Sequence, residues 1–235
     1  RGMNKLASTL SLTLPRAALL PLMARAIKVV EKRGTIAILD HLVLSVDPEG
    51  DVSVSATDLD IWITEALPAG TAKVTAAGAI ALKAGLLHDV LRKLPEGEVT
   101  IAAEKEAGRV TVSAGRARFS VNALPAEDLP EARTIAAEPF TIDPSALAGI
   151  VATTTFAISS EETRYYLNGI YLHAVDDPGS PSAKSGASEL EDGADRLLTA
   201  VATDGHRLSR LALPAPAGMP AFKGAIVPKK TCGLF

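Results

Sequence analysis

The hydrophobic period of the chain changes near residue 15. Residues 6–14 end in strict alternation of apolar and polar side chains, which is the period of a half-buried strand. Residues 15–32 predict an amphipathic helix, because apolar side chains fall on one side of a helical wheel and basic ones fall opposite. The apolar side consists of Leu19, Leu22, Met23, Ala26, Ile27 and Val30, and the basic side of Arg25, Lys28 and Lys32. Pro21 lacks the N–H of an interior helical residue, so we expect a kink there or a helix that begins near Leu19.

After Gly34 the pattern predicts mostly strands. Alternating segments separated by turn residues predict strands at 36–46, 51–57, 60–67, 72–79, 98–104, 108–114 and 116–122. Residues 83–94 carry an apolar stripe at helical spacing and predict a second helix, which Pro95 and Gly97 end. Proline and charged residues in 126–139 predict an ordered linker.

The sequence contains an internal repeat. Residues 12–19 align with 140–147, and 38–44 with 166–172, both at a separation of 128 positions. Two later pairs, Ala56-Thr57-Asp58 with Ala202-Thr203-Asp204 and Gly78-Ala79-Ile80 with Gly224-Ala225-Ile226, align at 146 positions. The increase of 18 positions locates an insertion, and the small, polar and acidic residues 176–195 supply one. We expect them to form a mobile surface loop between two strands.

The repeat predicts two copies of one domain, at 3–125 and 140–235. The first copy continues beyond Lys83 through a helix and three strands, whereas the second stops six residues after Lys229, its counterpart. We therefore expect the second copy to be incomplete at its C-terminus and the chain to be a fragment. Arg1 and Gly2 precede Met3 and are interpreted as a remnant of expression.

Composition narrows the classes of protein that fit. A chain of 235 residues that is 47% hydrophobic and 22% charged fits one large or two ordinary folded domains. No apolar run approaches the ~20 residues that span a bilayer and no signal peptide is recognisable, so a cytoplasmic protein with no membrane partner is expected. The single cysteine, Cys232, excludes an internal disulfide and a cysteine zinc cluster, so we expect a small core residue and no cofactor. A net charge of −3 argues against coating nucleic acid by charge alone, although a local basic surface remains compatible.

One late turn, residues 201–209, combines several side-chain chemistries. Asp204 and Gly205 suit a purely structural turn. Alternatively, Asp204 and His206 form an acid/base pair with Thr203 as nucleophile, as in a hydrolase. That interpretation also requires an oxyanion site and a substrate pocket, for which no other motif provides residues. A third interpretation is a surface that binds a partner.

Three runs of the sequence together resemble one family. Residues 162–169 (ETRYYLNG), 202–208 (ATDGHRL) and 226–230 (IVPKK) are similar, in this order, to signature runs of the bacterial sliding clamp, the β subunit of DNA polymerase III. The resemblance covers the whole chain after Gly2. It implies an α+β fold of three repeated domains, each with two helices packed on antiparallel sheets. The third domain would be absent here, and two full-length chains would close head to tail into a ring.

The resemblance also implies what the protein binds. The ring would hold duplex DNA through the phosphate backbone without reading bases. The DNA-facing residues would be Arg25, Lys28, Lys32, Arg33, Lys229 and Lys230. A hydrophobic cleft would receive short linear peptides from the replicative polymerase, the clamp loader and repair proteins. Its residues here would be Leu167, Thr203, Gly205, His206, Arg207 and Leu208.

The sequence allows alternatives for two tyrosines and for the way the protein would use DNA. Tyr165 and Tyr166 fit either the cleft or a packed core. The same resemblance also allows a clamp-like scaffold that binds partners without encircling DNA. No glycine-rich phosphate loop is present, so nucleotide hydrolysis would belong to the clamp loader.

Overall fold

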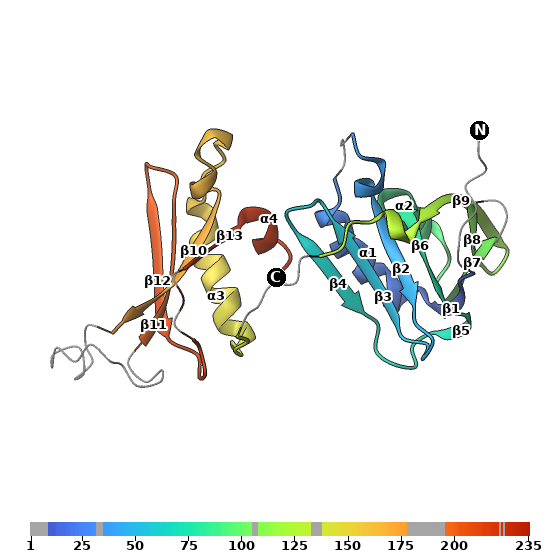
Figure 1. Ribbon diagram of the computed structural model, residues 1–235, viewed down its shortest axis with the longest axis horizontal. Helices are drawn as coiled ribbons and strands as arrows, with labels where there is room; N and C mark the ends of the chain where they lie inside the picture. The colour runs from blue at the N-terminus through green and yellow to red at the C-terminus, as the bar shows by residue number, and fades with distance from the viewer. Residues whose placement is uncertain are drawn as a thin grey trace. The chain divides into compact units, whose positions relative to one another are not determined.

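The computed structural model describes residues 9–31, 35–104, 108–132, 138–177, 196–220, 222 and 224–235. The chain divides into two compact units, Arg1–Arg133 and Thr134–Phe235, here called unit 1 and unit 2 (Figure 1). Each unit has helices packed against antiparallel strands. The predicted α+β fold class is therefore confirmed.

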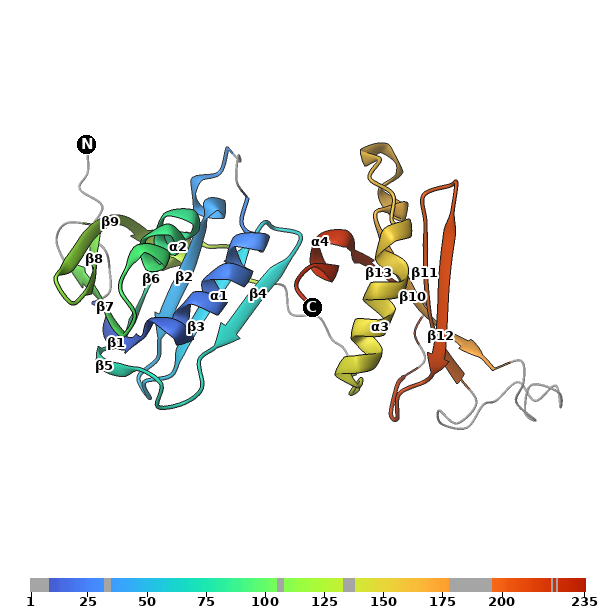
Figure 2. The ribbon, with the colours of Figure 1, turned by 180° about the vertical axis from the view of Figure 1, so that it is seen from behind.

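Unit 1 is built around a single antiparallel sheet. Its strands are β1 (Ser11–Pro15), β2 (His41–Val46), β3 (Val52–Thr57), β4 (Trp62–Ala66), β5 (Lys73–Ala76), β6 (Gly78–Lys83), β7 (Glu98–Glu104), β8 (Arg109–Ala114) and β9 (Ala117–Pro125). Its helices are α1 (Arg16–Val29) and α2 (Ala84–Lys93), with short 3-10 helices η1 (Ala37–Asp40) and η2 (Ala126–Asp128). The described strands follow the order β4-β3-β2-β6-β9-β8-β7-β1-β5. Helices α1 and α2 lie beside each other on one face of the sheet (Figure 2).

Helix α1 buries most of the predicted apolar stripe. Its buried residues are Leu19, Leu22, Met23, Ala26 and Val29, while Ile27 is half-buried. The helix begins at Arg16 and contains Pro21, so the predicted alternative of a start near Leu19 is wrong. Because Pro21 has no N–H, the carbonyl of Ala17 lacks its usual helical hydrogen bond. Both residues are exposed. Water can therefore replace the missing hydrogen bond.

Two segments that the sequence predicts as single strands are divided in the structure. Residues 36–46 form η1 and then β2, and residues 72–79 are shared between β5 and β6. Strand β5 pairs with β1, whereas β6 pairs with β2. The chain changes partners between them at Gly78, whose φ of 154° suits glycine. Alternation reports the period of a strand and not its partner, so the break was not predicted.

The chain leaves the sheet of unit 1 through residues 126–132, here called the strap. The strap crosses the face of the sheet opposite α1 and α2 (Figures 1 and 2). Ala126 and Leu129 pack there against the cluster of Ile38, Leu39, Val43 and Ala81. Trp62 Nε1 donates to the carbonyl of Pro130 over 3.4 Å, a long hydrogen bond. The strap thus covers part of the sheet's outer face.

Unit 2 has a smaller sheet and a different helical content. Its elements are α3 (Pro144–Thr154), η3 (Thr155–Ala157), η4 (Glu162–Leu167), β10 (Gly169–Asp176), β11 (Arg196–Thr203), β12 (Leu208–Pro214), β13 (Ala225–Pro228) and α4 (Lys229–Cys232). Asp143 caps α3 by accepting from the N–H groups of Ser145 and Ala146. Ile150 of α3 packs on a core that includes Cys232, which is 3% exposed, as predicted for a small core residue. Residues 178–195 of the predicted loop lie outside the described residues.

The two units repeat one strand order. The sheet order β12-β11-β10-β13 of unit 2 matches β4-β3-β2-β6 of unit 1. The cross-strand pairs Val43–Ser55 and Tyr171–Val201 agree with the separations of 128 and 146 positions. The last strand does not agree, because Val43 pairs with Ala81 while Tyr171 pairs with Ile226, which is a separation of 145. Matching Gly78 with Gly224 was therefore wrong by one residue, and Lys229 corresponds to Ala84.

Candidate peptide-binding site and basic helix residues

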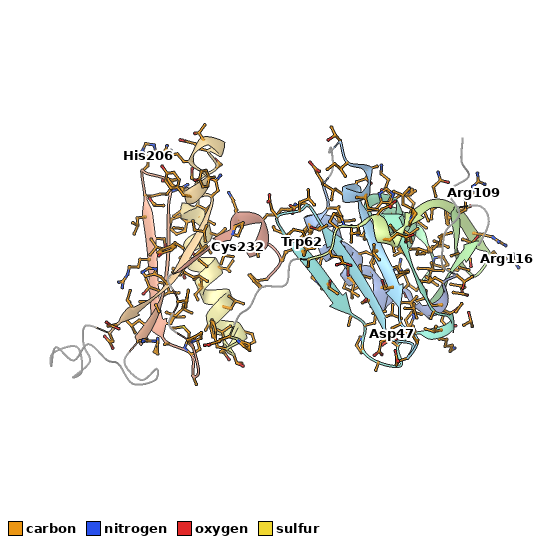
Figure 3. All side chains as sticks on the ribbon, in the orientation of Figure 1. Asp47, Trp62, Arg109, Arg116, His206 and Cys232 are labelled. Atoms are coloured by element: carbon orange, nitrogen blue, oxygen red, sulfur yellow. The ribbon has the colours of Figure 1, made fainter. Side chains whose placement is uncertain are left out.

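The turn from Thr203 to Leu208 joins β11 to β12 and is held by its own polar side chains. The hydroxyl of Thr203 donates to the carbonyl of Arg207 at 2.7 Å and accepts from the N–H of Gly205 at 3.1 Å. Asp204 Oδ1 accepts from the N–H groups of His206 and Arg207, both at 3.0 Å. Figure 3 shows His206 at the tip of this hairpin. The side chains of Thr203 and Asp204 therefore fix the turn.

The charge of Asp204 is stabilised within the turn. The backbone N–H groups of His206 and Arg207 are the main cause of a pKa lowered to about 2, and Arg207 contributes further. Arg207 Nε lies 2.8 Å from Asp204 Oδ2, and its guanidinium lies 5.7 Å from the ring centroid of Phe156. Gly205 has φ 90°, and a Cβ there would lie 3.1 Å from Arg164 Nη1. This side of the turn therefore presents two arginines beside an exposed phenylalanine.

A pocket of about 260 Å³ lies next to this turn in unit 2. Its lining residues are Tyr166, Leu167, Gly169, Tyr171, Val201, Ala202, Thr203 and Ile226. Of the cleft residues named from sequence, Leu167 and Thr203 line it, whereas Gly205, His206, Arg207 and Leu208 belong to the hairpin beside it. Leu208 is 63% exposed. The structure thus brings an apolar pocket and an exposed hairpin together.

The cleft residues predicted from sequence did not include Gly169 or Ala202 of this lining, nor the larger side chains of Tyr171, Val201 and Ile226. These three residues are cross-strand neighbours on β10, β11 and β13, so their proximity depends on the sheet register. Tyr165 and Tyr166 are 77% and 54% exposed, which excludes a packed core position for either. The internal repeat was the available signal for Tyr171, because residues 166–172 align with 38–44 of a predicted strand, but the alignment did not identify the neighbouring strands.

The geometry does not support the hydrolase interpretation of Thr203, Asp204 and His206. The hydrogen bonds of the Asp204 carboxylate run to backbone N–H groups and to Arg207, rather than to the imidazole of His206. The Thr203 proton is donated to a backbone carbonyl. A nucleophile needs a base within hydrogen-bond reach, and the turn instead uses both side chains for its own structure.

The basic residues named from sequence lie in different environments. Arg25 on α1 forms a bidentate ion pair with Glu65 on β4, with Nε 2.6 and 2.7 Å from the two carboxylate oxygens. This contact raises the pKa of Arg25, mainly through the hydrogen bond to Glu65. Lys28 is exposed in the last turn of α1, and Lys229 and Lys230 are exposed on α4. Lys32 and Arg33 lie outside the described residues.

The described residues give no sign of a metal site or a membrane span. No group of three or more His, Cys, Asp or Glu side chains in that part of the chain is placed to hold an ion. No helix there is long and apolar enough to cross a membrane.

Comparison with known proteins gives a consistent result over nearly the whole chain. The profile of the DNA polymerase III beta subunit N-terminal domain matches residues 10–133, and that of the central domain matches residues 141–233. The Beta sliding clamp of Caulobacter vibrioides is 40% identical over 225 residues, which is 94% of this chain and 55% of that protein. The Beta sliding clamp of Escherichia coli K12 is 32% identical over 199 residues, or 84% and 48%.

Solved structures agree with these relatives. A C. crescentus beta sliding clamp has a TM-score of 0.84 at 38% identity, covering 97% of this chain and 56% of that chain. A Bartonella birtlesii sliding clamp bound to griselimycin has a TM-score of 0.77 at 35% identity, covering 96% and 55%. The chain spans about half the length of the curated relatives it matches. Because the first profile alone matches more than half of the chain and the second comes after it in order, the chain belongs to the DNA polymerase III beta subunit family.

Proposed function

We propose that this chain is the first part of a DNA sliding clamp, which encircles duplex DNA and tethers the replicative polymerase and other partners through a peptide-binding cleft. The observation that carries the proposal is the apolar pocket of unit 2 beside the exposed hairpin of His206 and Leu208. In this proposal the protein is cytoplasmic, has no catalytic role of its own and needs no cofactor.

The pocket suits one or two apolar side chains of a peptide. Its volume of about 260 Å³ lies below the ~300 Å³ at which sites for whole small molecules begin. Leu167, Tyr171 and Ile226 provide apolar walls, while the exposed His206 and Arg207 offer hydrogen-bond donors to a peptide backbone or a polar side chain. Short linear peptides of the polymerase, the clamp loader and repair proteins are the proposed ligands.

The proposed DNA contacts are electrostatic. Lysines that are exposed on helices neutralise phosphates without reading sequence, and such contacts weaken steeply with salt. Lys28, Lys229 and Lys230 meet this requirement. Arg25 contributes less in this proposal, because Glu65 already neutralises its guanidinium. Helix α3, which occupies the place of α1 in the repeat, carries no basic residue.

Ring closure by two full-length chains is also part of the proposal. Residues 117–121 of β9 pair with β8 on one side, and within the described residues no strand pairs with their other side. Phe119 is 38% exposed there, and Arg116 and Arg118 are exposed nearby. An unpaired edge of this kind accepts a further strand. A partner strand with acidic and apolar side chains would complement it.

The cleft is tested by fluorescence polarisation with a labelled clamp-binding peptide from a replicative polymerase. We expect the double variant His206→Ala/Leu208→Ala to weaken binding by about tenfold or more, because truncated anchor contacts cost more than about 1 kcal/mol each. Leu59→Ala, at the equivalent turn of unit 1, is the matched control and leaves the affinity unchanged. Normal affinity in the double variant would refute the placement of the cleft.

Encirclement is tested separately, with the full-length protein on circular DNA. Reversing the charges of Arg25, Lys28 and Lys32 is expected to abolish retention after loading. Retention that is unchanged by this reversal would favour a scaffold that binds partners without enclosing DNA.

A further inference from the structure

Unit 1 contains a pocket of its own between the sheet and the strap. Its volume is about 240 Å³, close to that of the unit 2 pocket. Val43, Ser55 and Trp62 contribute from the strands, and Leu129 and Glu131 contribute from the strap. None of these residues belongs to the cleft or to the basic set described above.

The two pockets overlap on the two strands that the repeat places at the middle of each, β2 with β3 in unit 1 and β10 with β11 in unit 2. The register equates Val43 with Tyr171 and Ser55 with Val201, and each of these four residues lines the pocket of its own unit. Ala56 and Ala202 correspond in the same way. From these strands the pockets extend in opposite directions, because the unit 1 pocket continues over β4 to the strap and the unit 2 pocket continues over β13, the counterpart of β6, to η4.

The lining of the unit 1 pocket is mostly apolar and includes one carboxylate, that of Glu131. Ser55 and Thr64, whose hydroxyls hydrogen-bond each other at 3.0 Å, add polar but uncharged groups to this lining. The strap carries three exposed carboxylates, Glu127, Asp128 and Glu131, of which Glu131 lines the pocket, and residues 126–132 include no basic side chain. Its described polar contact with the sheet is the 3.4 Å hydrogen bond from Trp62, which is weak. A ligand would need an apolar side chain beside a positive charge.

We propose that the unit 1 pocket is a second peptide-docking site, which takes a leucine-type side chain from a short peptide with a basic residue next to it. The proposal rests on the proposed function only in taking the overlapping pocket of unit 2 to be a peptide-binding site. The apolar side chain fills the space beside Trp62, and the basic residue pairs with the carboxylates of the strap, Glu131 above all. Peptides with acidic flanks are disfavoured there by like charge.

Each pocket has its own chromophore, so the two sites are read separately. Trp62 is the only tryptophan and lines the unit 1 pocket, whereas all three tyrosines lie in unit 2. The probe is a blocked peptide of two leucines and then two lysines, titrated into the 235-residue chain. We expect a saturable change in Trp62 emission. Glu131→Lys is expected to weaken that binding by roughly three- to tenfold, since a rim charge contributes ~1 kcal/mol.

Matched controls decide between the outcomes. Leu167→Ala alters the unit 2 pocket and is expected to leave the Trp62 titration unchanged, so failure of the cleft and failure of this site are distinguishable. The absence of a saturable change, or an equal change with serines in place of the leucines or with Glu131→Lys, would overturn the proposal. A change of Trp62 emission on raising the protein concentration alone would assign the pocket to a second copy of the chain, and would also overturn it.

Discussion

The same turn is built twice in this chain with different residues. In unit 2, Thr203 and Asp204 accept from the backbone of Gly205, His206 and Arg207. In unit 1, Thr57 accepts from the N–H of Leu59 at 2.9 Å, and Asp58 accepts from those of Asp60 and Ile61. The Thr-Asp pair therefore belongs to the architecture of the repeated domain. The rest of the turn is free to differ between the two copies.

The residue directly after the pair shows that difference. Gly205 has φ 90° and Leu59 has φ 79°, so both copies need the left-handed region. Only glycine enters that region without steric cost. Unit 1 thus keeps a strained leucine, whereas unit 2 has a glycine that also allows close approach to Arg164. Burial differs as well, because most of the buried apolar side chains of the described residues belong to unit 1, whereas unit 2 has a smaller core around Ile150, Ile170 and Leu198.

The largest expected effect tests this difference in burial. Leu44 of β2 is 0% exposed, whereas Leu172, its counterpart on β10, is half-buried. Leu44→Ala should lower the free energy of unfolding of unit 1 by about 2–5 kcal/mol, and Leu172→Ala should lower that of unit 2 by about half as much or less. Urea unfolding monitored by Trp62 fluorescence reports unit 1, and tyrosine absorbance reports unit 2. Equal losses would contradict the comparison.

A smaller effect is expected from exchanging the turn residues. Gly205→Leu should destabilise unit 2 by about 1–2 kcal/mol, because a side chain is forced to positive φ. Leu59→Gly should change the stability of unit 1 by less than about 1 kcal/mol, since relief of strain is offset by glycine's greater freedom in the unfolded chain. The same two optical probes measure both variants. A destabilised Leu59→Gly together with a tolerated Gly205→Leu would show that backbone strain is not what separates the turns.

The pH dependence of unit 2 provides a third test. The pKa of Asp204 is about 2 in the folded state, below the value of ~3.9 for an unperturbed aspartate. The carboxylate therefore stabilises the fold fully above about pH 4, and this contribution is lost as the pH falls towards 2. In Asp204→Asn, stability measured by tyrosine absorbance should depend less on pH across this interval. An unchanged acid transition would mean that the turn does not stabilise the charge.

The hydrophobic periodicity of the sequence predicted where helices and strands lie better than it predicted which strands pair with each other. The stripe of α1 and the Thr-Asp turns were visible because each depends on residues close together in the chain. The division of 72–79 at Gly78, the one-residue shift of β13 and the positions of Tyr171 and Ile226 in the pocket depend on which strands pair. The bidentate contact of Arg25 with Glu65 joins residues 40 positions apart, so a helical wheel could not reveal it.

The smallest expected effect concerns that contact. Arg25 is 39% exposed, so Arg25→Ala should lower the free energy of unfolding of unit 1 by only about 0.2–1 kcal/mol, the usual range for an ion pair at a surface.

The effect of Arg25→Ala on DNA association should be smaller than that of Lys28→Ala, because Glu65 already neutralises the guanidinium. In the full-length protein, the salt dependence of DNA association should decrease measurably for Lys28→Ala and remain nearly unchanged for Arg25→Ala. Glu65→Gln is the matched control, since it leaves Arg25 without its anionic partner and should steepen the salt dependence. An Arg25→Ala variant that reduced the salt dependence as much as Lys28→Ala would show that Arg25 contacts DNA in spite of Glu65. The basic helix face predicted from the sequence would then include Arg25 on equal terms with Lys28.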